Sequence, residues 1–113
     1  MSGSAPTLRD LLASRLALVE RLSRAISALQ RLQQARAGAE MDVQRCEIGL
    51  GLEPHADMAR DLLSPSLLEA SLLDARQRVE DSDRSVERCE AEIADLESNL
   101  AEMDRQIETA ARA

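Results

Sequence analysis

The clearest pattern in the chain is a row of apolar or small residues that recurs at alternating intervals of four and three. Its members are Leu68, Leu72, Ala75, Val79, Ser82, Val86, Cys89, Ile93, Leu96, Leu100, Met103, Ile107 and Ala110. A heptad row of this kind keeps one narrow apolar stripe of a helix facing a partner helix. Ser64 and Pro65 are typical of an N-cap and a first helical residue, and neither proline nor glycine follows Pro65. We therefore expect a helix over residues 66–111.

The N-terminal part of the chain carries a second row with the same spacing. Its apolar or small members are Leu8, Leu11, Leu18, Leu22, Ala25, Leu29, Leu32, Ala39, Val43, Cys46 and Leu50. Arg15 and Arg36 interrupt this row. Thr7 and Asp10 have the spacing of a capping box, which marks a helix start. The pattern predicts a first helix over residues 7–48.

Between the two predicted helices the sequence indicates a connection over residues 49–65. Gly49 and Gly51 can adopt the positive φ that often ends a helix, and a proline follows them. Residues 55–63 lie between two prolines and contain enough apolar residues for a short helix that caps the end of the hairpin. Residues 1–6 are small and polar, and we expect them to be disordered.

The distribution of charge predicts how the two helices pair. Residues 8–36 contain six arginines and two carboxylates, a net charge of +4, whereas residues 80–108 contain eleven carboxylates and three arginines, a net charge of −8. With a turn near residue 58, antiparallel neighbours have residue numbers that sum to about 116, which places these oppositely charged stretches side by side. The sequence therefore predicts an all-α fold: one domain over residues 7–111, with two long antiparallel helices forming a coiled-coil hairpin and a short helical turn in the connection.

Composition excludes several classes of function. The chain has no Phe, Tyr or Trp and a net charge of −7, which argues against base stacking and against nucleic acid as a partner. It has no apolar run long enough for a membrane span, and its first 18 residues lack the pattern of a secretory signal. An organellar transit peptide is the alternative for the arginine-rich, acid-poor first 36 residues, but that stretch also carries a matched apolar row. All fourteen basic residues are arginine, which is typical of a GC-rich genome, so we expect a bacterial source. Since the sequence shows neither a membrane span nor a secretory signal, we expect a cytoplasmic protein.

The residues that could carry chemistry do not form a recognisable site. Cys46 and Cys89 fall on the apolar rows, where cysteine acts as a small hydrophobe, and the predicted register separates them too far for an intrachain disulfide. An interchain disulfide in a dimer stays open as an alternative. His55, the single histidine, does not complete a zinc site with these cysteines. We therefore expect no enzyme activity, no cofactor, no metal and no small-molecule substrate.

One feature of the sequence points to a partner. The first helix carries an extra apolar edge beside its row, formed by Leu12, Val19 and Ile26 at intervals of seven, with Leu16 nearby. The second helix carries a single narrow stripe from Val79 onward, so a two-helix hairpin leaves this edge exposed. Exposed contiguous Leu, Val and Ile residues usually mark an interface. The alternatives are that the second helix rotates to cover both edges, or that the connection folds back over them.

These observations favour a non-enzymatic interaction protein, such as an adaptor, assembly factor or small chaperone, that binds a partner helix or forms a homodimer. The expected binding residues are Leu12, Leu16, Val19 and Ile26. The overall architecture also resembles the coiled-coil stalk proteins of bacterial type III secretion and flagellar export, which insert into a ring ATPase, although those stalks are commonly basic. A homo-oligomeric structural coiled coil is a further alternative. The opposite charges within one chain argue against it, yet an antiparallel domain-swapped dimer would satisfy them equally.

Overall fold

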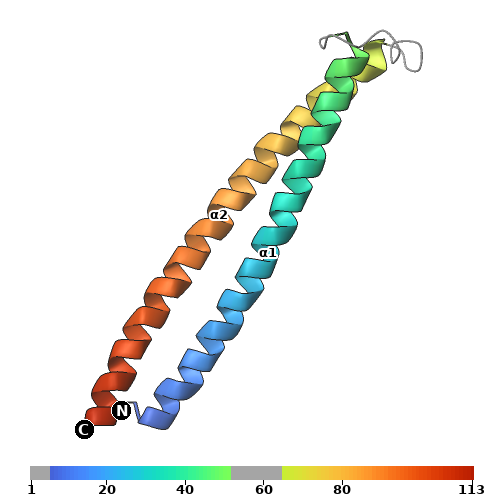
Figure 1. The fold of residues 1–113 in the computed structure, drawn as a ribbon. Helices are drawn as coiled ribbons and strands as arrows, with labels where there is room; N and C mark the ends of the chain where they lie inside the picture. The colour runs from blue at the N-terminus through green and yellow to red at the C-terminus, as the bar shows by residue number, and fades with distance from the viewer. Residues whose placement is uncertain (1–5, 52–64) are drawn as a thin grey trace, which may run out of the picture. The chain divides into compact units, whose positions relative to one another are not determined.

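The structure, a computed structural model, describes residues 6–51 and 65–113 and contains two α-helices there. Helix α1 spans Leu8–Gly49, and helix α2 spans Pro65–Arg112 (Figure 1). Each helix begins and ends within one residue of the range that the apolar rows predict. The predicted all-α fold of two long helices is confirmed.

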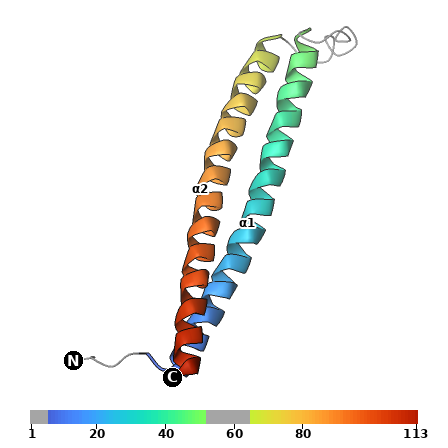
Figure 2. The ribbon, with the colours of Figure 1, turned by 60° about the vertical axis from the view of Figure 1, so that its left-hand side comes forward.

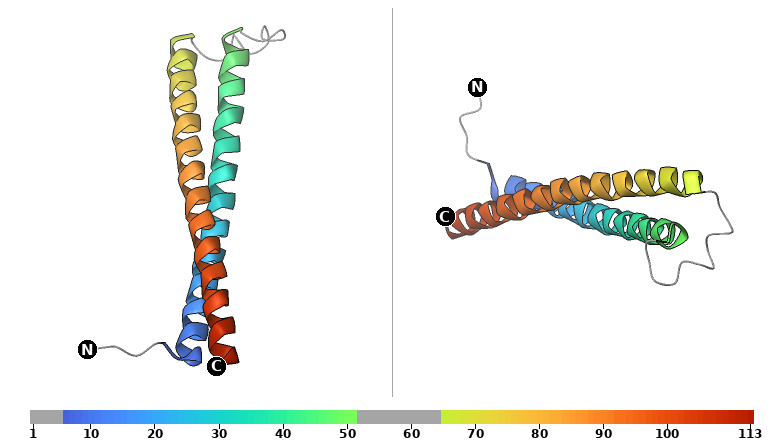
Figure 3. Two further views of the ribbon diagram at one scale, coloured as in Figure 1. Left: turned by 90° about the vertical axis from the view of Figure 1, so that its left-hand side faces the viewer. Right: turned by 90° about the horizontal axis from the view of Figure 1, so that it is seen from above.

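The chain divides into two compact units, each of which contains part of both helices. The terminal unit comprises Met1–Leu29 and Arg88–Ala113, and the central unit comprises Gln30–Glu87. Within each unit the α1 segment runs antiparallel to the α2 segment, and the views in Figures 1, 2 and 3 agree that the two segments lie side by side. The antiparallel pairing of the predicted hairpin is therefore confirmed in both units. The short helix expected over residues 55–63, and His55 within it, lie outside the described residues.

Both ends of α1 have the local structure that their sequence predicts. At the start, the Thr7 backbone N–H donates to Asp10 Oδ2 at 3.2 Å and the Asp10 backbone N–H donates to Thr7 Oγ1 at 3.1 Å. This reciprocal capping box satisfies two backbone donors that have no partner inside the helix. At the other end, Gly51 has a φ of 79°, and its N–H donates to the Ile48 carbonyl at 3.0 Å. Gly51 thus supplies the left-handed residue that ends the helix.

The core of the central unit is built from the two apolar rows and includes small as well as large residues. Its buried side chains are Ala39, Cys46, Leu68, Leu72, Ala75 and Val86. Ala75 is fully buried and Ala39 is only 2% exposed, so short side chains face the seam at these points. At Gly49 a Cβ atom would lie 3.0 Å from Leu68 Cδ1, so the missing side chain lets Leu68 pack directly on the α1 backbone. The seam of this unit is therefore closed by small-to-large packing.

The terminal unit continues the same rows with its own buried set, which comprises Leu11, Ala25, Cys89 and Leu96. The Cys89 thiol donates to the Ala25 carbonyl at 3.3 Å across the seam. A carbonyl inside a helix already accepts from its own helix, so the thiol uses a second lone pair and no polar group is left unpaired. Cys89 thus behaves as the small core residue that its place in the row predicts.

The two arginines that interrupt the α1 row set the register between the helices. Each occupies an a position, the first of the two core positions of the heptad, and each forms an ion pair with α2. Arg15 Nε lies 2.7 Å from Asp104 Oδ1, and Arg36 Nε lies 2.8 Å from Asp83 Oδ1. In both pairs the residue numbers sum to 119, close to the predicted 116. The arginines stand three heptads apart in sequence, and so do their aspartate partners, so the α1 and α2 segments within each unit pair with the same sum of residue numbers.

Candidate partner-binding surface

The terminal unit exposes a row of apolar side chains on α1, called here the apolar edge and formed by Leu12, Leu16, Val19 and Ile26. Leu12 is 50% exposed, Leu16 60% and Ile26 43%, while Val19 is half-buried. The e position of the heptad, which lies beside the core position a on the helix surface, is occupied by Leu12, Val19 and Ile26. Leu16 occupies the b position, which lies beside e and farther from the seam. The edge extends for about 21 Å, at 1.5 Å per residue. It is therefore long enough to hold about four turns of another helix.

The α2 helix leaves Leu12, Leu16 and Ile26 of this edge exposed. Its own apolar row packs against the a and d row of α1, as the burial of Leu96 and Cys89 shows, and this leaves the e position of α1 outside the seam. The alternative in which the second helix rotates to cover both edges therefore does not occur in the structure. The other alternative, in which the connection folds over the edge, concerns residues outside the described ranges.

Beside the apolar edge, α2 carries three carboxylates at intervals of seven, called here the acidic row and formed by Glu90, Glu97 and Asp104. All three occupy the e position of α2, and in an antiparallel pair the e positions of the two helices lie on the same side of the seam. When e positions are paired with each other, rather than with a positions as in the two arginine pairs, Leu12 lies opposite Asp104 and their residue numbers sum to 116. By the same register Val19 faces Glu97 and Ile26 faces Glu90. One side of the terminal unit therefore presents an apolar row on α1 next to an acidic row on α2.

A hollow in the central unit supports this assignment of sides. It is lined by Glu40 and Arg76 together with the core residues Val43 and Val79. Glu40 and Arg76 also occupy e positions, and their residue numbers also sum to 116. The opposite side of the terminal unit is different in character. The residues that line a hollow there include Ser14 and Arg21 of α1 with Asn99 and Gln106 of α2. Only the side with the e positions combines an apolar row with an acidic one.

Electrostatic contacts near the acidic row divide its members into two kinds. Asp104 is held by Arg15 across the seam. Glu90 and Glu97 are exposed, and none of the ion pairs among the described residues includes either of them. Two carboxylates beside the apolar edge are therefore available to a partner.

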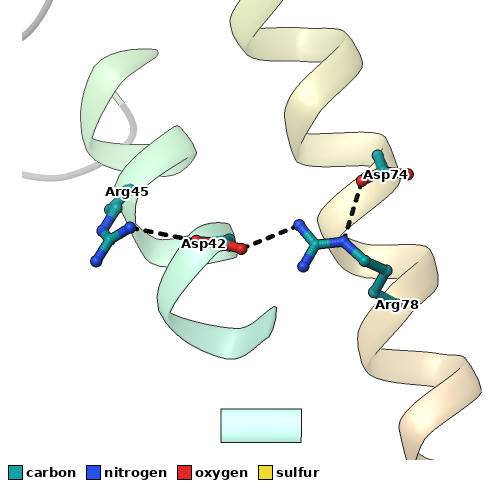
Figure 4. A network of polar contacts seen from close by, with 4 residues as sticks. All are labelled: Asp42, Arg45, Asp74 and Arg78. Atoms are coloured by element: carbon teal, nitrogen blue, oxygen red, sulfur yellow. Dashed lines mark hydrogen bonds and ion pairs between the residues drawn. The ribbon is translucent and has the colours of Figure 1, made fainter. Parts of the chain in front are cut away.

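The central unit contains a charged cluster that joins the helices (Figure 4). Arg78 donates to Asp74 on its own helix at 3.0 Å and lies 3.1 Å from Asp42 of α1, which also contacts Arg45 at 3.4 Å. The hydrogen bonds that the Arg78 guanidinium donates to Asp74 and then to Asp42 raise its pKa, so it stays charged. All four side chains are substantially exposed. Because water screens exposed charges, these ion pairs contribute little to the free energy of unfolding.

Other chemistry finds little support in the part of the chain that the structure describes. No three His, Cys, Asp or Glu residues there come together as metal ligands. Cys46 and Cys89 are both buried and carry free thiols. Neither helix, over its described residues, has a stretch long and apolar enough to cross a lipid bilayer.

Sequence reasoning missed two features of this surface. Leu8, placed in the apolar row, is 39% exposed because it lies in the first turn of α1, and it lengthens the apolar edge by one turn. The acidic row could have been found by reading every seventh residue of α2 once the register was fixed. Met41, Leu67 and Leu73 of the central unit are also exposed but share no heptad position.

Comparisons with models of protein families, with curated proteins and with solved structures find no match to this chain.

Proposed function

We propose that this chain is a non-enzymatic interaction protein, an adaptor, assembly factor or small chaperone, that binds a partner helix through the apolar edge. The observation that carries this proposal is the exposure of Leu12, Leu16 and Ile26 in a row with helical spacing. The spacing between edge residues is seven, with Leu16 between the first two, which is the pattern that a further helix needs for knobs-into-holes packing. Leu12, Leu16 and Ile26 are exposed beside the seam between α1 and α2, so a partner can dock on them without opening the hairpin.

The composition of the chain and its two thiols support the class of partner and the compartment that we propose. The acidic surface favours a protein partner over nucleic acid. Two buried free cysteines suit a reducing compartment, so the proposal places the protein in the cytoplasm. None of the charged groups of the described residues is buried, and they form no enclosed site, which supports a binding role.

The test compares two triple variants with the wild type. The edge variant is Leu12→Gln with Leu16→Gln and Ile26→Gln, and the matched control is Met41→Gln with Leu67→Gln and Leu73→Gln. Both remove three exposed apolar side chains, and glutamine keeps helix propensity. Circular dichroism should show the wild-type helix content in both, because none of the six positions is buried.

Two measurements then separate the outcomes. Sedimentation equilibrium of the reduced protein shows whether the chain self-associates, and affinity capture from cells of the source organism shows which protein co-purifies. The proposal expects one dominant partner that the wild type and the control retain and that the edge variant loses. Retention of that partner by the edge variant would refute the proposal. A wild-type dimer that only the edge variant converts to a folded monomer would favour the homo-oligomeric coiled coil instead.

A further inference from the structure

We propose that the helix seated on the apolar edge is amphipathic and carries basic residues along the one flank that faces α2. This inference rests on the proposed function and specifies the chemistry of its partner. It follows from the asymmetry of the surface, which is apolar on α1 and acidic on α2. A helix that packs on Leu12, Val19 and Ile26 must bring one of its flanks alongside Glu90 and Glu97.

Glu90 and Glu97 determine which charge the flank of the partner helix can carry, because both are exposed carboxylates. Both are exposed and neither forms an ion pair among the described residues, whereas Asp104 in the same row is already held by Arg15. A docked helix would partly desolvate the glutamates, which disfavours their charged form unless a cation is supplied. Arginine or lysine residues seven apart on the partner would meet both carboxylates. An acidic flank at the same place would add like-charge repulsion, so the row also discriminates between partners.

The other flank of the docked helix does not lie beside a row of carboxylates. It lies over the outer side of α1, where the positions beside the edge hold Arg9, Ser23 and Gln30, followed by Ala13, Glu20 and Ser27. These residues carry one positive and one negative charge among them and form no row of like charges. The requirement for basic residues is therefore one-sided, and the direction in which the partner runs determines which of its two flanks must be basic.

A second copy of this chain does not meet the requirement. Its α2 helix is acidic over residues 80–108. Its α1 helix could place its own apolar edge on the first copy, but the residues beyond that edge, which are again Arg9, Ser23 and Gln30 with Ala13, Glu20 and Ser27, include one arginine and one glutamate. Neither helix offers basic residues seven apart on that flank, so the observations favour a different protein as partner.

The test uses designed 21-residue helical peptides as probes in place of the unidentified partner. All share one leucine and isoleucine row with alternating intervals of three and four. One set carries arginine along one flank of that row, a second set carries glutamine there, and a third carries glutamate. Each set is made with the charged residues on either flank, because the docking direction is not fixed. Binding to the full chain is measured by isothermal titration calorimetry at low and moderate salt, below the concentration at which the peptides self-associate.

We expect the arginine peptide with the matching flank to bind about 2- to 30-fold more tightly than its glutamine counterpart, from two rim ion pairs. The glutamate peptide should bind most weakly, and added salt should reduce the difference. Replacing Glu90→Gln and Glu97→Gln should remove the preference for arginine. The matched control, Glu92→Gln with Asp95→Asn, changes the charge equally on other faces of α2 and should leave the preference intact.

The outcomes distinguish this inference from the proposed function. Equal binding of all three peptide sets, with loss of binding in the variant of Leu12, Leu16 and Ile26, would overturn the basic flank and leave edge binding standing. Binding that the edge variant retains, or no binding by any peptide, would overturn edge binding itself. A wild-type chain that dimerises through the edge and excludes every peptide would show that a second copy occupies the surface, which also overturns the inference.

Discussion

Arg15 and Arg36 occupy core positions of the heptad where leucine would be the ordinary residue, and replacing them tests the role of the two ion pairs. We expect Arg15→Leu and Arg36→Leu each to stabilise the hairpin, because each adds apolar surface to the seam and removes a weak ion pair. The same changes should make the register less specific. A polar residue at a core position commonly fixes register and orientation at a cost in stability.

The magnitude follows from the exposure of the four side chains. Arg15 and Asp104 are 42% and 51% exposed, and Arg36 and Asp83 are 44% and 42% exposed. Ion pairs in such positions contribute about 0.2–1 kcal/mol. A leucine buried to a little over half there would contribute about 1–1.5 kcal/mol, of the 1.5–3 kcal/mol for complete burial. The ion pair is lost and the aliphatic part of arginine already covers some of that surface, so the net gain is at most about 1 kcal/mol per substitution.

The assay is urea unfolding followed by circular dichroism, with the free energy of unfolding extrapolated to water. Arg9→Leu and Arg24→Leu make the same chemical change at exposed positions outside the seam, and these controls should not gain stability. Arg15→Gln and Arg36→Gln remove the ion pairs without adding apolar surface and should lose a few tenths of a kcal/mol. A loss of more than about 1 kcal/mol in the leucine variants would refute the reasoning, because the pairs would then contribute more than exposed charges can.

Three smaller changes test the packing and the electrostatics. Gly38→Ala should stabilise the protein by about 0.5–1 kcal/mol in thermal unfolding, because an added Cβ at this mid-helix position meets nothing within 4 Å. Gly49→Ala should gain less than Gly38→Ala or destabilise in the same assay, because its Cβ would lie 3.0 Å from Leu68 Cδ1. Hydrogen bonding from Arg105 lowers the pKa of Glu102, so this pair should stabilise the fold at pH above the ordinary pKa of glutamate and lose that effect as pH falls through the lowered value. NMR titration should show the Glu102 pKa rise toward its ordinary value in Arg105→Gln, and an unchanged pKa would refute this assignment.

The sequence was sufficient for the secondary structure and for the pairing of the helices. Heptad periodicity is a local property, so both apolar rows could be read directly, and they place the helix ends within one residue. The opposite charges of the two halves then predicted the antiparallel orientation, which the Arg15–Asp104 and Arg36–Asp83 pairs confirm. The predicted sum of residue numbers, 116, lies close enough to the observed sum of 119 that the correct heptads are paired.

What the sequence did not reveal depends on contacts between the helices. Arg15 and Arg36 read as interruptions of a row until the register places a carboxylate beside each. The side on which Glu90 and Glu97 lie is likewise undefined until the e positions of two helices are paired. The exposure of Leu12, Leu16 and Ile26 was expected, whereas binding through them stays a prediction, because exposure alone does not identify what covers a surface.

The arrangement of core and edge has a consequence for how a partner acts on this protein. The a and d seam is complete within the chain, and the apolar edge lies outside it, so a docked helix adds to the hairpin rather than replacing one of its helices. Because such a partner binds the folded hairpin and not the unfolded chain, it should raise the free energy of unfolding by mass action. The added stability should fall on the terminal unit, which contains Leu12, Leu16 and Ile26, and hydrogen exchange there should slow more than in the central unit. A partner that replaced α2 on α1 would instead expose Leu96 and Cys89, which are buried against α1 in the free chain.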